Sequence, residues 1–72
     1  MPIVVKLGEV LYQRRMSLTE LAERVDISLA NLSILKQSKA RAIRFSTLEA
    51  LCRELDCQPG DLLEFRQEQA PP

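Results

Sequence analysis

The stretch from Ser17 to Lys36, SLTELAERVDISLANLSILK, carries two helix-start signals in one short segment, which restricts the chain to a compact arrangement of short helices. Ser17 stands three residues before Glu20, the spacing at which a hydroxyl and a carboxylate each satisfy a free backbone N–H at a helix start. Ser28 is a second N-cap candidate, because serine hydroxyls accept hydrogen bonds from the first turn of a helix. The sequence therefore predicts two short helices, with bounds near residues 18–25 and 29–37.

Apolar residues recur at three- and four-residue steps through both predicted helices, which is the spacing of one face of an α-helix. In the first helix they lie opposite the charged residues Glu20, Glu23 and Arg24. We expect the two apolar faces to pack on each other and to hold the second helix in place, as in a helix-turn-helix. The residues expected inside are Leu18, Leu21, Ala22, Val25, Ile27, Leu32 and Leu35.

The rest of the chain predicts three more helices. Apolar residues at helical spacing place one over residues 6–15. Another should begin at Ser46, because this serine again precedes a glutamate, Glu49, by three residues. Pro59 opens a short last turn, since a proline at a helix start lacks only an N–H that has no helical partner there. The overall prediction is an all-α fold.

The loop from Gln37 to Phe45 has no strong turn signal. Ile43 and Phe45 alternate with Arg44 at its end. This alternation predicts that both apolar side chains pin the loop to the core while the arginine points outward. Arg44 is then free to hold a phosphate.

The first five residues, MPIVV, are apolar and β-branched, which predicts either an extended strand or the lead-in to one. A strand needs a partner for its backbone groups. That partner is either the segment near Leu63 to Gln67 of the same chain, or the same strand, Ile3–Val5, of a second subunit in a homodimer. We expect one domain over residues 1–66 and a frayed polar tail over 67–72.

The amino-acid composition limits which kinds of protein the chain can be. Seventy-two residues, 46% of them hydrophobic, allow one small domain. No apolar run approaches the roughly 20 residues that span a bilayer, and no secretory signal is evident, so we expect a cytoplasmic protein without a membrane partner. Cys52 and Cys57 are the only cysteines and histidine is absent, which disfavours a zinc site. We expect no metal and no cofactor, with both cysteines packed in or near the core.

The formal net charge is zero, but the charges are segregated along the chain. No acidic residue stands between Asp26 and Glu49, so this segment carries +4 and the rest of the chain −4. Its four cations are Lys36, Lys39, Arg41 and Arg44. Such a segment at the end of the second predicted helix favours a nucleic acid partner, although runs of one charge also occur on ordinary solvated surfaces.

The segment from Ser17 to Leu35 resembles the helix-turn-helix of the phage-repressor and Cro-like (XRE-type) family of DNA-binding regulators. The run KARAIRFSTLEALCRELDCQPGDLLE, from Lys39 to Glu64, is similar to the rest of that domain in its small bacterial members. The resemblance covers most of the chain. It implies a compact five-helix repressor-like domain whose third helix enters the major groove of double-stranded DNA, in a transcriptional regulator that works as a dimer.

Residues 29–37 are then the candidate recognition helix. Ser28 at its start can offer its hydroxyl and nearby N–H groups to a phosphate. Asn31 can bridge an adenine edge, and Ser33 can donate or accept at either kind of base pair. The four cations of the basic segment are expected to contact backbone phosphates on either side.

Three apolar residues leave the function open between two classes. Leu29, Ala30 and Ile34 occupy positions where the family has long polar side chains for base contacts, and they can only pack on thymine methyl groups. Either the chain is a sequence-specific regulator that reads a methyl-rich site, or this face binds another protein in an interaction module with weak or no operator binding. An enzyme is the weakest class, because no catalytic constellation or small-molecule site can be named.

Overall fold

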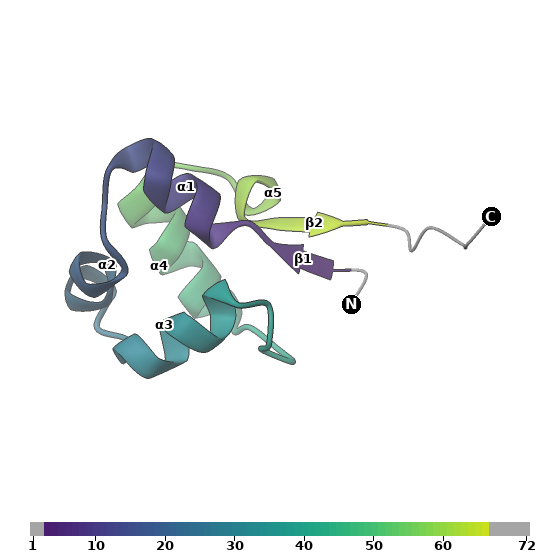
Figure 1. Ribbon diagram of the computed structural model, residues 1–72, viewed down its shortest axis with the longest axis horizontal. Coiled ribbons are helices and arrows are strands. Elements are labelled where there is room, and N and C mark those ends of the chain that lie inside the picture. The colour runs from purple at the N-terminus through teal and green to yellow at the C-terminus, as the bar shows by residue number, and fades with distance from the viewer. Residues whose placement is uncertain (1–2, 67–72) are drawn as a thin grey trace.

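The computed structural model describes residues 3–66, which form five helices and a pair of short strands (Figure 1). The helices form one body and the strand pair projects from it. The predicted helical fold is confirmed, with a small sheet added, and the predicted tail over 67–72 lies outside the described residues. In chain order the elements are β1 (Ile3–Val5), α1 (Leu7–Arg14), α2 (Leu18–Val25), α3 (Leu29–Lys36), α4 (Phe45–Leu55), α5 (Pro59–Leu62) and β2 (Leu63–Phe65).

Among residues 3–66, the core consists of nine buried side chains, and every helix contributes to it. Leu21 of α2 and Leu32 of α3 are 0% and 1% exposed, so the two helices of the motif meet through fully buried leucines. The predicted inner residues Leu18, Ala22, Val25 and Ile27 pack around them at the margin of the core. The complete core is Leu7, Val10, Leu11, Leu21, Leu32, Leu35, Leu51, Leu55 and Leu62. The predicted inner faces of both helices are confirmed.

Both predicted serine caps of the motif are present. Ser17 Oγ accepts a hydrogen bond from the Glu20 N–H at 3.0 Å, and Ser28 Oγ accepts one from the Asn31 N–H at 3.1 Å. Asp26 ends α2 in the left-handed conformation, with φ 55°, and its N–H donates to the Ala22 carbonyl. These local bonds satisfy backbone N–H groups at the start of each helix and at the end of α2.

The start of α4 corrects two predictions. The helix begins at Phe45 after the N-cap Arg44, so Ser46 lies inside the first turn and does not cap it. Phe45 is 88% exposed and does not pin the loop, whereas Ile43 packs against the core as predicted. The alternation of an extended chain ends where the helix starts, and the helical turn points Phe45 into solvent.

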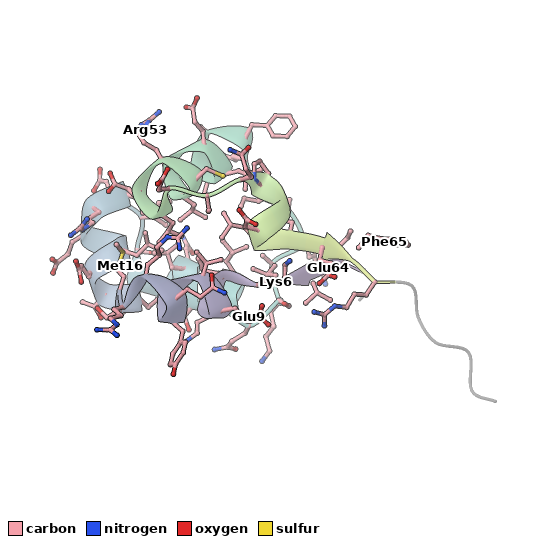
Figure 2. The ribbon with its side chains drawn as sticks, turned by 90° about the horizontal axis from the view of Figure 1, so that it is seen from above. Lys6, Glu9, Met16, Arg53, Glu64 and Phe65 are labelled. Carbon is pink, nitrogen blue, oxygen red and sulfur yellow. The ribbon has the colours of Figure 1, made fainter. Side chains whose placement is uncertain are left out.

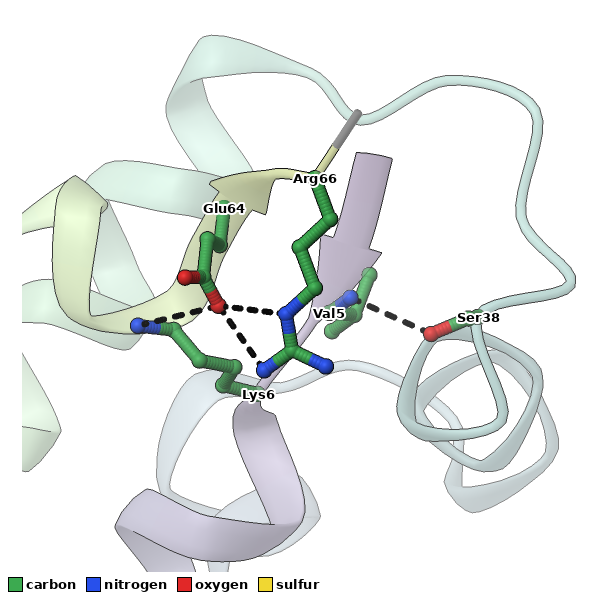
Figure 3. Close-up of polar contacts among 5 residues, drawn as sticks. All are labelled: Val5, Lys6, Ser38, Glu64 and Arg66. Atoms are coloured by element: carbon green, nitrogen blue, oxygen red, sulfur yellow. Dashed lines mark hydrogen bonds and ion pairs between the residues drawn. The ribbon is translucent and has the colours of Figure 1, made fainter. Parts of the chain in front are cut away.

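The small sheet pairs β1 with β2 of the same chain, the first of the two partners that the sequence left open. The strands run antiparallel, with Ile3 opposite Phe65 and Val5 opposite Leu63. On the other side of β1, the Val5 N–H donates to Ser38 Oγ at 3.1 Å (Figure 3). Ser38 follows α3 with φ 59°, a conformation that favours glycine. Its hydroxyl therefore ties the end of α3 to the sheet in a way that glycine cannot.

Replacing Leu32 by alanine should lower the free energy of unfolding by about 2 to 5 kcal/mol, because the side chain is fully buried where α3 packs against α2 and α1. Urea denaturation followed by circular dichroism measures this loss. Leu29→Ala on the same helix is the matched control, since Leu29 is 46% exposed, and should cost much less. Equal losses for the two variants would mean that the inner face of α3 is wrongly assigned.

Substitutions at Ser38 should separate its backbone strain from its hydrogen bond. Ser38→Ala keeps the left-handed strain and leaves the Val5 N–H without its acceptor, so we expect a loss of about 1 to 3 kcal/mol in unfolding free energy. Ser38→Gly loses the same bond but relieves the strain, which offsets about 1 kcal/mol. A glycine variant no more stable than the alanine variant would contradict this reading.

Candidate nucleic-acid interface

The outer side of α3 forms an exposed ridge. We call Ser28, Leu29, Ala30, Asn31, Ser33 and Ile34 the α3 ridge. Leu29 and Ile34 are each 46% exposed, and every ridge residue except the half-buried Ser33 is exposed. The ridge stands opposite the buried Leu32 and Leu35, so the contacts that hold α3 in the core also present its outer face to solvent.

The four cations of the basic segment are all exposed. Within residues 3–66, none of them lies within 4.0 Å of a carboxylate oxygen. Most cations elsewhere in the described chain are engaged. Lys6, Arg24, Arg53 and Arg66 each form an ion pair, and Arg14 donates to the carbonyls of Leu55 and Asp56 at the end of α4. Positive charge is therefore left uncompensated along one segment, at the end of α3 and in the loop that follows it.

An open cavity of about 510 Å³ lies between α3, the loop after it and the start of α4. It brings together the ridge residues Ser28, Asn31 and Ile34 with Arg44. Asn31 can thus contact a base while Arg44 contacts a phosphate of the same duplex.

Two polar residues of this cavity, Asp26 and Thr47, were not predicted from the sequence. Thr47 lies in the first turn of α4, on the side of the cavity, and no local sequence signal relates it to α3, which is why it was missed. Asp26 adds one carboxylate, and it disfavours a phosphate directly at that end.

The remaining predicted site residues lie apart from this cavity. The Lys36 stem runs over α1, where a Cβ on Gly8 would stand 3.2 Å from its Cε atom. The Ser33 hydroxyl accepts a hydrogen bond from the Gln37 side chain at 3.2 Å, so it is already engaged. Arg41 lines a separate cavity of about 200 Å³ beside the sheet. Lys36 and Arg41 therefore flank the ridge on different sides.

Groups suited to metal or redox chemistry are sparse. Residues 3–66 bring together no group of three His, Cys, Asp or Glu side chains of the kind that holds a metal ion. Cys52 and Cys57 are free and partly buried, and burial raises the pKa of the Cys57 thiol, with Cys52 and Asp61 raising it further.

No helix among the described residues is long and apolar enough to cross a membrane.

Comparison with known proteins gives two matches. Residues 6–68 match the family described as Cro/C1-type HTH DNA-binding domain. A curated protein of Bacillus subtilis (strain 168), named "Uncharacterized HTH-type transcriptional regulator YozG", is 58% identical over 69 residues, which cover 96% of this chain and 82% of that protein. Both matches include the whole of the helix-turn-helix, from Ser17 to Leu35.

Proposed function

Because the chain belongs to the family of Cro/C1-type helix-turn-helix DNA-binding domains, we propose that this regulator binds a specific operator by inserting α3 into the major groove. One observation carries the proposal: an exposed α3 ridge stands beside four exposed cations that form no ion pair within residues 3–66. An α-helix fits the major groove, and unpaired cations beside it can neutralise the phosphates that border the groove.

Phosphate contacts would come from the segment after α3. Arg44 is the N-cap of α4, which has no side-chain cap, so the N–H groups of its first turn are open to an acceptor. A helix N-terminus with an adjacent arginine attracts a phosphate through both hydrogen bonds and the helix dipole. Lys39 and Arg41 extend the positive surface along the loop. These contacts supply affinity and register and carry no sequence information.

Base recognition would come from the ridge itself. The Asn31 amide can form a bidentate pair with the N6 and N7 atoms of adenine. Leu29, Ala30 and Ile34 cannot form hydrogen bonds to bases, but they pack favourably on the C5 methyl group of thymine. We therefore expect an operator whose half-sites are rich in A·T pairs at the positions that face α3.

A second candidate function rests on the same ridge. Leu29 and Ile34 are exposed apolar side chains, and such residues also mark contacts with other proteins. In that case the domain would recruit a protein partner through α3 with weak operator binding. The salt dependence of binding affinity distinguishes the two functions. Phosphate contacts release counterions and weaken as salt rises, whereas apolar contacts do not.

Selection of duplexes from a random pool at two salt concentrations tests the proposed function. We expect enrichment of an A·T-containing motif, and affinity that falls by about three or more orders of magnitude between roughly 50 and 200 mM salt if six or more phosphates are contacted. A pool that shows no enrichment at either concentration would favour the protein-binding candidate.

Replacing Lys39 and Arg44 together by alanine should weaken binding to every duplex alike and flatten the slope of log affinity against log salt by about 2, one for each phosphate contact. Fluorescence anisotropy at several salt concentrations measures the slope. Arg24→Ala with Arg53→Ala is the charge-matched control, because both arginines are ion-paired outside the basic segment. An unchanged slope in the Lys39 and Arg44 variant would remove these residues from the interface.

Asn31→Ala should relax base preference without changing the salt slope. If Asn31 reads adenine, the variant loses about 1 to 3 kcal/mol of discrimination at one position of each half-site. Competition binding with duplexes substituted at single positions measures this loss. The N-cap bond to the Asn31 backbone N–H is kept, so helix stability should be little affected. A variant with an unchanged preference at every position would exclude Asn31 from base recognition.

A further inference from the structure

The cavity beside the sheet is separate from the α3 ridge and has a volume of about 200 Å³. The sheet forms one wall of it, lined by Ile3, Val5 and Leu63. The antiparallel register pairs Val5 with Leu63, so these side chains lie on one face of the sheet together with Ile3. The loop after α3 forms another wall, and Figure 1 shows this loop next to β1. We call this space the sheet cavity.

The walls of the sheet cavity are mainly apolar. The buried Leu35 and the half-buried Ile43 line it from the side of the helices. On the loop, Ala40 and Ala42 line it with small side chains, which leave the space unfilled. Water is held poorly between apolar walls, because an ordered water molecule needs about two to four polar partners. The sheet cavity is therefore suited to an apolar group.

Two polar side chains among the described residues line the sheet cavity, and both can donate hydrogen bonds. Ser38 Oγ accepts the Val5 N–H at 3.1 Å, which leaves the hydroxyl hydrogen to donate (Figure 3). The exposed Arg41 guanidinium carries only donors, and no carboxylate oxygen of residues 3–66 lies within 4.0 Å of it. No acidic side chain of residues 3–66 lines the cavity. The polar part of the site is therefore suited to an anion.

We propose that the sheet cavity binds a short aliphatic carboxylate, whose chain lies between the sheet and the loop and whose carboxylate pairs with Arg41 and Ser38. An arginine and a carboxylate form two parallel charge-assisted hydrogen bonds. A cavity of about 150 Å³ accepts benzene, so this one has room for an aliphatic chain of roughly six to eight carbons. Each further CH₂ group should tighten binding about threefold to fourfold until the chain fills the cavity.

The same side chains disfavour other amphipathic molecules. An alkylammonium ion would place a positive charge beside Arg41 without an acidic partner in the lining. An amino acid carries that ammonium next to its carboxylate and meets the same repulsion. An alcohol of equal length has the apolar chain but forms no ion pair. The order of affinity should therefore be carboxylate, then alcohol, then amine.

A bound carboxylate would compete with DNA for Arg41. This consequence rests on the proposed function, in which the loop cations contact backbone phosphates. A carboxylate on Arg41 removes one such contact, so it should weaken duplex binding and flatten the slope of log affinity against log salt by about 1. Lys39 and Arg44 do not line the sheet cavity and keep their contacts. The carboxylate site itself requires no DNA, so the two proposals can fail separately.

Titration of the full-length chain with octanoate, followed by backbone amide shifts in NMR spectra without DNA, tests the site. We expect a Kd of about 1 mM or tighter, with the largest shifts at Val5, Ser38 and Ile43. Butanoate should bind about tenfold or more weakly, and octylamine should leave these amides unchanged. Octanoate that causes no shifts up to about 10 mM overturns the proposal, as do shifts centred on the α3 ridge.

Arg41→Gln separates the ion pair from the apolar contact. The variant should lose about tenfold or more in octanoate affinity, while its affinity for 1-octanol stays that of the wild type. Arg53→Gln is the matched control, because Arg53 pairs with Glu49 on α4 and Figure 2 shows it away from Glu64 and Phe65 of β2. It should bind octanoate like the wild type. Equal octanoate affinity in both arginine variants contradicts the proposed pairing with Arg41.

Ala42→Leu tests the apolar part by filling the cavity. Ala42 is exposed, so we expect thermal melting to show a folded chain, but octanoate and 1-octanol should both lose binding. Undiminished octanoate binding by this variant overturns the assignment to the sheet cavity.

Anisotropy of a labelled duplex then tests the competition. Octanoate should weaken duplex binding by the wild type and have no such effect on Arg41→Gln. Octanoate that occupies the cavity without changing duplex affinity would remove Arg41 from the phosphate contacts. A chain that binds DNA but no octanoate would overturn the carboxylate site alone.

Discussion

The packing of α3 against α2 and α1 through buried leucines is the contact on which the other features depend. Leu21 and Leu32 are essentially inaccessible to water, and Leu35 completes the inner face of α3. A helix of eight residues has too few hydrogen bonds to persist alone, so its existence and orientation come from this packing. The same contacts decide that Leu29 and Ile34 face solvent. Exposure of the ridge is thus a consequence of the core.

The distribution of ion pairs makes a neutral chain locally basic. Glutamates neutralise Lys6, Arg24, Arg53 and Arg66, and the C-terminal carbonyls of α4 engage Arg14. No carboxylate of residues 3–66 pairs with the basic segment after α3. Because exposed pairs contribute little to stability, this pattern matters more for the surface potential than for the fold. Among residues 3–66, unpaired positive charge is therefore concentrated beside the α3 ridge.

Signals within one turn of helix were readable from the sequence, whereas contacts between distant segments were not. The caps at Ser17 and Ser28 and the inner faces of both helices depend on residues three or four apart. The predicted start of α4 was wrong because the spacing of Ser46 and Glu49 matches that of a capping box. The helix instead begins after Arg44, which has an extended backbone and makes no side-chain cap hydrogen bond. The bond from Val5 to Ser38 joins residues 33 positions apart and had no local signal. Which site residues contact DNA depends on the partner, and the sequence offers only their chemistry.

Titration of the chain with a duplex, followed by backbone amide chemical shifts in NMR spectra at low and high salt, tests the central claim most directly. If the α3 ridge and the cations beside it form the DNA-binding surface, the largest shifts should fall within residues 28–44 and fade as salt rises. Residues of β1, β2 and α5 should change little. Shifts centred on the sheet, or shifts in α3 that persist unchanged at high salt, would contradict the claim that this ridge and its flanking cations bind DNA.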